Sequence, residues 1–399
     1  MNGIAHRLQT MFPDMVAWRR HLHRNPELSY EEKRTSGFVA DQLRQWGIDV
    51  RTGVGGYGVV GHVRGTADGP TVALRADMDA LPIQDEKTSE YASTVPGVMH
   101  ACGHDAHTAA LLAVAKLFAD NREELKGSVK LLFQPAEEVS PGGAAPMIRE
   151  GALDGVDAVY GVHLWTPFPA GTVYSAPGPV MAAADEFTIE IKGKGGHGGL
   201  PHETVDSIMV AAQLIVSLQT IVSRSTDPVA PSVVSIGSIQ AGSSFNVIAE
   251  TCRLNGTVRS FDTAIRDGIV DRMKQICAAT AHMYGAEIIL DYKPGYPPVV
   301  NDEAEAERFF RVAAHVFGAE RAARSPLIMA GEDFSYYLHR VPGCFMFVGA
   351  GNAEAGIVSP HHHPKFDIDE TAMLQSATLL ASMAVDYMES ERKAQGPVE

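Results

Sequence analysis

The chain has 399 residues, of which 45% are hydrophobic and 20% charged, the composition of a globular protein with room for two domains. Its formal net charge of −15 argues against nucleic acid as a partner, because phosphates require a basic surface. No run of 18 uninterrupted apolar residues occurs, so we expect no membrane span.

Helices and strands alternate over the first 180 residues. Ser29-Tyr-Glu-Glu32 has the pattern of a capping box, and we expect it to open a helix that runs through Gln45. Short apolar strands separated by helices predict a largely parallel sheet with helices on both faces. The expected strands are 58–64, 71–76, 128–133 and 158–163, and the expected helices are 107–119 and 144–150.

In the middle of the chain, helices and strands are expected in a different order. The pattern predicts, in order, strand 186–192, helix 205–224, strands 232–240 and 249–259, helix 263–284 and strand 286–292. This βαββαβ order is the ferredoxin-like signature. We therefore predict an α/β catalytic domain over residues 1–182 and 295–399, with a lid or dimerisation domain inserted at 183–294. The returning segment is expected to form helix 303–317, strand 344–348 and helix 370–391.

One stretch concentrates metal-binding side chains: His100-Ala-Cys-Gly-His-Asp-Ala-His107. Cysteine and histidine suit zinc or a neighbouring first-row metal, and Cys102 with His104 can bind one ion from a turn. His107 begins the expected helix, so we predict a supporting role for it. The other ligands must come from elsewhere in the chain.

Polar side chains also stand where the predicted strands end. Asp77 and Asp79 follow one strand, Glu137 and Glu138 follow another, and His163 ends a third. In such sheets the chemistry collects beyond the carboxyl ends of the strands. Adjacent residues in an extended chain point opposite ways, so one glutamate can bind a metal while the other takes a proton from water. Spacing alone does not say which glutamate does which, and the two aspartates are expected to orient histidine ligands.

Two further regions offer candidates. One histidine of the run at 361–363 is expected to be a ligand, since three would not fit one coordination sphere. In the inserted domain, a glycine-rich loop displays His197, while Asn246 and Arg259 flank and end a strand. Arginine is suited to binding a carboxylate through two hydrogen bonds.

Five motifs together resemble the aminoacylase/carboxypeptidase-G family of dinuclear metallopeptidases. The similar branch contains hippurate hydrolases, N-acyl-amino-acid amidohydrolases and plant indole-acetyl-amino-acid hydrolases. The resemblance extends from about His23 to Glu370, nearly the whole chain. Its motifs are Arg75-Ala-Asp-Met-Asp-Ala-Leu-Pro82, the 100–107 stretch, Phe133-Gln-Pro-Ala-Glu-Glu138, Gly331-Glu-Asp-Phe334 and His362-His-Pro-Lys-Phe366.

The resemblance implies two divalent metal ions with ligands at Cys102, His104, Glu138, His163 and His362. It implies Glu137 as the general base and Asp79 as the residue that orients a ligand histidine. It also implies that His197, Asn246 and Arg259 bind the substrate carboxylate and the oxyanion.

Relatives in this family are commonly dimers through the inserted domain, and a tetramer is a further option. In a dimer, His197 and Asn246 would act across the subunit interface. The chain departs from the wider family in having Asp77-x-Asp79 instead of a His-x-Asp pair, and Cys102 with His104 where a bridging aspartate is usual. Both departures are typical of the hippurate-hydrolase branch, and zinc, manganese, cobalt and nickel all stay open.

The expected reaction is hydrolysis of the amide bond of an N-acyl amino acid. The alternatives are a dipeptidase or carboxypeptidase, or a deacetylase of the N-acetyl-diaminopimelate type. A metal-bound binding protein is disfavoured, because it has no use for Glu137. Four scattered cysteines and an N-terminus without a signal-like apolar stretch predict a cytoplasmic protein.

Overall fold

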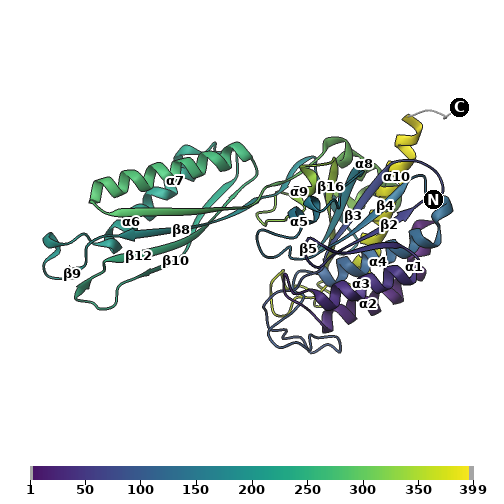
Figure 1. Cartoon of the computed structure of the whole chain (residues 1–399), viewed down its shortest axis with the longest axis horizontal. Coiled ribbons are helices and arrows are strands. Elements are labelled where there is room, and N and C mark those ends of the chain that lie inside the picture. Colours follow the sequence, from purple (N-terminus) through teal and green to yellow (C-terminus); the bar gives the residue numbers. More distant parts are fainter. Residues whose placement is uncertain (1–2, 395–399) are drawn as a thin grey trace. The chain divides into compact units, whose positions relative to one another are not determined.

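The computed structural model describes residues 3–394, which form two compact units (Figure 1). The second unit comprises Met181–Val299 and Leu327–Glu332, and the first comprises the rest of the described chain. Residues 327–332 join the second unit where Ile328 pairs with Met181 in a short bridge. The boundaries expected from sequence, 183–294, stay a prediction.

An eight-stranded mixed sheet forms the centre of the first unit, in the order β1-β2-β4-β3-β5-β16-β6-β15. The pairs β3–β4, β3–β5, β5–β16 and β6–β15 are parallel. The prediction of an α/β fold with a largely parallel sheet is therefore confirmed. The strands are β1 (Asp49–Val54), β2 (Gly58–Arg64), β3 (Thr71–Asp77), β4 (Ser128–Gln134), β5 (Ala158–Pro169), β6 (Val173–Ser175), β15 (Ala322–Arg324) and β16 (Gly343–Gly351).

Helices cover this sheet, and α4 (His104–Asp120) is the most deeply buried of them. It is rich in alanine and leucine on all sides, as expected for an enclosed helix. It packs against α2, α10 and β3. The other helices of this unit are α1 (Ile4–Thr10), α2 (Phe12–Arg24), α3 (Lys33–Gln45), α5 (Ala144–Arg149), α8 (Glu303–Phe317), α9 (Ser335–Leu338) and α10 (Thr371–Ala394).

Two predicted element boundaries were wrong in ways that matter for the site. The helix expected from residue 107 begins at His104, because Gly103 adopts the left-handed conformation (φ 92°) that lets the chain turn into the helix. The strand expected to end at His163 continues to Pro169, since it pairs with β16 along most of that length. His163 therefore lies inside β5.

The capping-box prediction was also wrong. Helix α3 begins at Lys33, and neither Ser29 nor Glu32 caps it. Its first amides donate instead to the carboxylate of Glu27, at 2.8 Å from both Arg34 N and Thr35 N.

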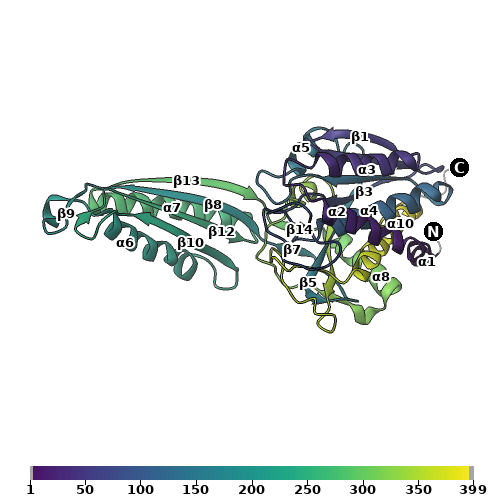
Figure 2. The same ribbon diagram turned by 90° about the horizontal axis from the view of Figure 1, so that it is seen from below.

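A four-stranded antiparallel sheet forms the second unit, in the order β10-β12-β8-β13. Helices α6 (Ser207–Thr220) and α7 (Thr263–Tyr284) lie along one face of this sheet (Figure 2). Phe187, Ile189 and Ile191 alternate inward from β8 and meet the helices in a separate core. The strands are β8 (Ala183–Lys192), β10 (Ser232–Ala241), β12 (Thr251–Ser260) and β13 (Glu287–Tyr296), with the short pair β9 (Gly196–His197)–β11 (Val247–Ile248) beside them. Another short pair, β7 (Gly178–Met181)–β14 (Val299–Asn301), has most of its residues in the first unit.

One helical stretch of the described chain, Ser207–Ser225, is long and apolar enough to cross a membrane by length and composition. It spans α6 and the following turn, Ile221–Ser225. Leu214 and Leu218 are buried against the sheet, whereas Ile208 and Val216 are exposed. The stretch thus has one apolar face inside the unit and another on its surface.

Candidate metal centre

The five predicted metal ligands meet beside the N-terminus of α4. The Sγ atom of Cys102 lies 3.5 Å from Nε2 of His163. The Oε1 atom of Glu138 lies 3.8 Å from Nε2 of His104 and 3.3 Å from Nε2 of His362. One ligand atom from each of Cys102, His104 and Glu138 falls within 4.8 Å of the others. The fold therefore gathers side chains that are up to 260 residues apart in the sequence.

Asp79 links two of these side chains. Nδ1 of His104 lies 2.9 Å from the Asp79 carbonyl oxygen and 3.2 Å from its Oδ1, which directs Nε2 of the ring toward Glu138. The other carboxylate oxygen of Asp79 accepts the backbone N–H of Glu138 at 2.9 Å. Such outer partners fix the tautomer and orientation of a ligand histidine.

Two neighbouring histidines have different surroundings. His163 points Nδ1 at the carbonyl oxygen of Leu164 (2.8 Å), which leaves Nε2 for the cluster. His107 uses both ring nitrogens: Nδ1 lies 2.7 Å from Oδ1 of Asp77, and Nε2 accepts the N–H of Leu164. His107 therefore braces the strand that carries His163.

The histidine run places a second ring near the cluster. His361 stacks on Trp165 with ring centroids 4.3 Å apart, and its Nε2 lies 3.0 Å from the Leu164 carbonyl oxygen. Its ligand atom is within 4.8 Å of those of Cys102 and His163. His363 is exposed, and its Nδ1 accepts the N–H of Lys365.

Behind the cluster lies a buried ion-pair network that the sequence did not predict. Arg75 donates to Asp77 (2.6 Å), Gln134 (2.9 Å) and Asp333 (3.0 Å). Burial raises the pKa of Asp333 to about 6, although Arg75 acts in the opposite direction. Arg75 and Asp77 stand in one of the five motifs and Asp333 in another, Gly331-Glu-Asp-Phe334, but nothing in the spacing of these motifs showed that Arg75 pairs with Asp333.

The donor set fits divalent metal ions. Nε2 of His104 and Oε1 of Glu138 are buried without a hydrogen-bond partner among the described residues, and such an atom costs about 1–3 kcal/mol. Burial, Glu138 and Glu137 raise the pKa of the Cys102 thiol well above its usual range. Burial lowers the pKa of His104, yet Asp77 and Asp79 raise it to about 10. This surplus of negative charge is what a dication would neutralise, and a coordinated thiol is deprotonated.

In the second unit, two of the three predicted substrate-binding residues lie together. His197 pairs with Val247 across β9 and β11, and the N–H of Gly198 donates to the carbonyl oxygen of Asn246 at 2.8 Å. Both side chains are exposed.

Arg259 does not join His197 and Asn246 within this unit. It lies opposite Ala184, near the end of β12, and donates to the carbonyl oxygen of Val258 at 3.0 Å. The short β9–β11 pair adjoins the other end of β12, where Thr251 is opposite Lys192: β11 comes just before Thr251 in the chain, and β9 comes just after Lys192. Eight residues of strand separate Thr251 from Arg259, a distance of roughly 26 Å at about 3.3 Å per residue.

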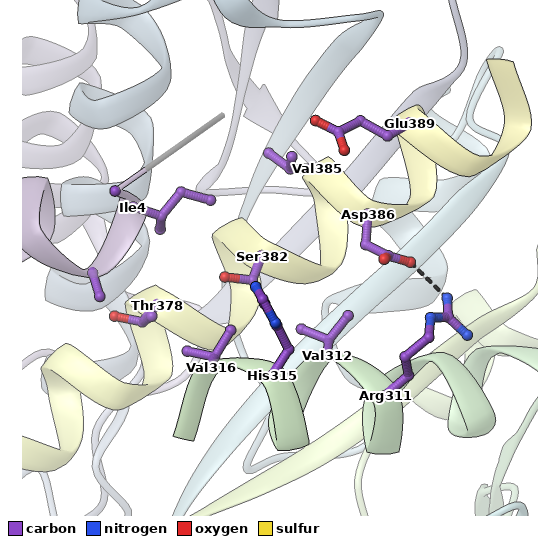
Figure 3. A pocket seen from close by; sticks show the side chains of 12 residues that line it. Ile4, Arg311, Val312, His315, Val316, Thr378, Ser382, Val385, Asp386 and Glu389 are labelled. Atoms are coloured by element: carbon purple, nitrogen blue, oxygen red, sulfur yellow. Dashed lines mark hydrogen bonds and ion pairs between the residues drawn. The ribbon is translucent and has the colours of Figure 1, made fainter. Parts of the chain in front are cut away.

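A cavity of about 570 Å³ lies elsewhere in the first unit, between α1, α8 and α10 (Figure 3). Its wall mixes apolar side chains such as Ile4 and Val312 with His315 and the Arg311–Asp386 ion pair (2.7 Å). Among residues 3–394, no group of three metal-binding side chains includes a residue of this wall. The candidate site is therefore the cluster at α4.

Residues 73–386 match the Peptidase family M20/M25/M40. The chain belongs to this family. The resemblance inferred from the five motifs is thereby confirmed, and this M20 protein is a metal-dependent hydrolase that acts on amides.

Two relatives align with nearly all of this M20 protein, and a third aligns with about three quarters of it. It is 50% identical to the YhaA protein of Bacillus subtilis (strain 168) over 384 residues, 96% of this chain and 97% of that protein. It is 42% identical to the N-acetyl-L-cysteine deacetylase of the same organism, over 97% of this chain and 91% of that enzyme. It is 46% identical to the N-acyl-L-amino acid amidohydrolase of Geobacillus stearothermophilus, over 73% and 79% respectively.

A solved structure has the same fold. The Bacillus subtilis YXEP protein, described as a dinuclear metal binding peptidase from the M20 family, superposes with a TM-score of 0.83. It is 35% identical to this M20 protein and is matched over 96% of this chain and 99% of that one.

Proposed function

We propose that the protein is a metal-dependent amidohydrolase that cleaves N-acyl-L-amino acids to a carboxylic acid and a free amino acid. The observation that carries the proposal is the buried Glu137 next to Glu138, in a cluster whose donors suit metal ions. The substrate class is supported by the relatives, which include an N-acyl-L-amino acid amidohydrolase and an N-acetyl-L-cysteine deacetylase.

The proposed cofactors are two divalent ions, chosen from zinc, manganese, cobalt and nickel. When bound, such ions lower the pKa of a water molecule and polarise the scissile carbonyl. The proposed ligands are Cys102, His104, Glu138, His163 and His362. A cysteine ligand favours zinc by its softness.

The protein's own side chains divide the remaining work. Glu137 accepts a proton from the attacking water and then passes it to the leaving amine. His197 stabilises the developing oxyanion. Arg259 and Asn246 hold the free carboxylate of the substrate, for which the planar guanidinium of arginine is suited.

We propose a homodimer formed through the second unit. Support comes from the outer face of α6, where Ile208, Met209 and Val216 are 44–64% exposed with no charge between them. Beside it, β10 is the edge strand of the sheet. Because His197 and Asn246 lie far from Arg259 in one protomer, we propose that they serve the site of the partner subunit.

A cytoplasmic location is proposed as well. The four cysteines are buried and unpaired, as expected in a reducing compartment. Small N-acyl amino acids, and neither nucleic acid nor a membrane, are the proposed partners.

The test is the Glu137→Gln variant. It should bind metal as the wild type does and lose roughly 10²–10⁴ of kcat, since the amide cannot accept the proton. Metal content is measured by elemental analysis, and Glu123→Gln, an exposed change, is the matched control. Full activity in Glu137→Gln would remove the general-base assignment.

A further inference from the structure

The turn that carries Glu137 has a backbone conformation that its own sequence does not favour. Ala136, the residue before Glu137, has φ 53°, in the left-handed region that residues other than glycine seldom adopt. Such a conformation persists only where the surrounding structure holds it, and it is common at functional sites. Contacts with neighbouring residues must therefore hold the turn at residues 136–139 in place.

On the N-terminal side of Glu137, the turn is held by Glu32. Oε1 of Glu32 accepts the N–H of Ala136 at 2.7 Å, and the Glu32 side chain is fully buried. Ala136 is itself fully buried, so removal of this acceptor would leave its N–H without a hydrogen bond.

On the C-terminal side, the turn is held by Tyr30. The Tyr30 hydroxyl donates to the carbonyl oxygen of Val139 at 2.9 Å and accepts the N–H of Gly142 at 3.1 Å. The preceding residue, Ser29, donates its hydroxyl to Oδ2 of Asp79, the same oxygen that accepts the N–H of Glu138. The backbone on both sides of Glu137 is thus bonded to residues 29–32 directly or through Asp79.

Residues 29–32 are themselves fixed. Oε1 of Glu32 also accepts the N–H of Tyr30 (3.1 Å), which has φ 67°. Before this segment, the carbonyl oxygen of Glu27 accepts the N–H of Ala80, and the Glu27 side chain caps α3. The Glu31 side chain, by contrast, is exposed. The segment can therefore hold the turn without moving with it.

We propose that Tyr30 and Glu32 are positioning residues that set the place of the Glu137 carboxylate by clamping residues 136–139. The inference rests on the proposed role of Glu137 as general base. It also explains why Ser29-Tyr-Glu-Glu32 looks like a capping box and does not act as one. Its side chains bind residues 136–139 directly or through Asp79, and Glu27 caps α3 in their place.

The test compares Tyr30→Phe and Glu32→Ala with the wild type in metal-loaded protein. Each should lower kcat by about 10- to 100-fold, the scale of a misplacement near 1 Å, while KM and bound metal change less than about twofold. Tyr57→Phe and Glu31→Ala are matched controls at exposed positions and should behave as wild type. Glu32→Gln keeps an oxygen for the Ala136 N–H, so it should recover most of the kcat lost in Glu32→Ala.

A double-mutant cycle separates positioning from a general structural effect. In the Glu137→Gln background, Tyr30→Phe should cause no further loss of kcat, because the residue it positions no longer takes the proton. Hydrogen–deuterium exchange supplies a readout without turnover. The peptide covering 133–142 should exchange faster in Tyr30→Phe than in Tyr57→Phe.

The outcomes distinguish the two proposals. If Glu137→Gln is fully active, the proposed function fails and this inference fails with it. If Glu137→Gln is inactive but Tyr30→Phe keeps wild-type kcat, or lowers it equally in both backgrounds, only the positioning proposal is overturned. Loss of metal from Tyr30→Phe would also overturn it, since the segment would then act on the ligands. Tyr30 is 43% exposed, so this variant keeps the test valid even if Glu32→Ala does not fold.

Discussion

At the scale of single residues, the candidate site is organised by buried carboxylates. Asp79 touches both His104 and Glu138, and Asp77 is shared between Arg75 and His107. Neither aspartate is among the proposed ligands. Each carries a negative charge into a region where burial makes charge costly, and cationic or metal-bound partners offset that cost.

Glu32 makes the stability of the protein depend on pH. Burial, together with repulsion from Asp79, raises the pKa of Glu32 from 4.5 to about 7. The folded protein therefore holds this proton more tightly than the unfolded chain, and the associated stability is lost as the pH rises from about 4.5 through 7.

Replacing Glu32 with glutamine should remove this dependence. The free energy of unfolding of metal-free protein is measured with urea for Glu32→Gln and for the wild type. The value for the variant minus the value for the wild type should increase from pH 5 to pH 8. The expected gain is on the order of 1–3 kcal/mol. A difference between the two proteins that is the same at both pH values would contradict the raised pKa.

At the scale of elements, Asp185 ties three parts of the second unit together. Its buried carboxylate on β8 accepts from Arg266 Nε on α7 (2.7 Å) and from Tyr292 Oη (2.6 Å) and Gly295 N (2.8 Å) on β13. One side chain thus fixes the helix to two neighbouring strands.

Asp185→Ala should strongly destabilise the protein. Arg266 would be left partly buried without its carboxylate, and breaking such a pair costs about 3–5 kcal/mol. Asp291→Ala, at a site 61% exposed, should change the free energy of unfolding by less than about 0.5 kcal/mol. Urea unfolding followed by circular dichroism measures both, and equal effects would contradict a structural role for Asp185.

The sequence predicted best those elements whose ends are set locally. Helices α7 and α8 were expected at their observed bounds, since Asp262 and Asp302 cap them through the N–H groups of Ile265 and Glu305. The extension of β5 was missed, because it depends on pairing with β16, which lies far along the chain.

The same contrast holds in the site. Cys102, His104 and the two glutamates stand in compact motifs, so local spacing was enough to single them out. The Arg75–Asp333 ion pair joins residues 258 positions apart, and only the folded sheet brings them together. The capping-box error arose because Ser29 and Glu32 have helix-capping chemistry but find their partners in another part of the fold.

At the scale of the whole molecule, the proposed dimer explains the exposed apolar face of α6. Val216→Glu places a charge in the middle of that face and should give a monomer by sedimentation velocity. Activity should fall with it, because the partner subunit would no longer supply His197 and Asn246. Gln275→Glu, on the exposed side of α7, is the control and should stay dimeric. A fully active monomer would contradict the shared site.

The most direct measurement of the central claim is metal-dependent release of amino acids. Chelated protein is reloaded with zinc, manganese, cobalt or nickel and given N-acetyl, N-benzoyl and indole-acetyl amino acids together with dipeptides. We expect release from N-acyl amino acids that requires metal and is lost in Glu137→Gln, while preference for dipeptides would indicate a dipeptidase or carboxypeptidase. No release with any metal, from folded protein that binds two ions, would contradict the amidohydrolase.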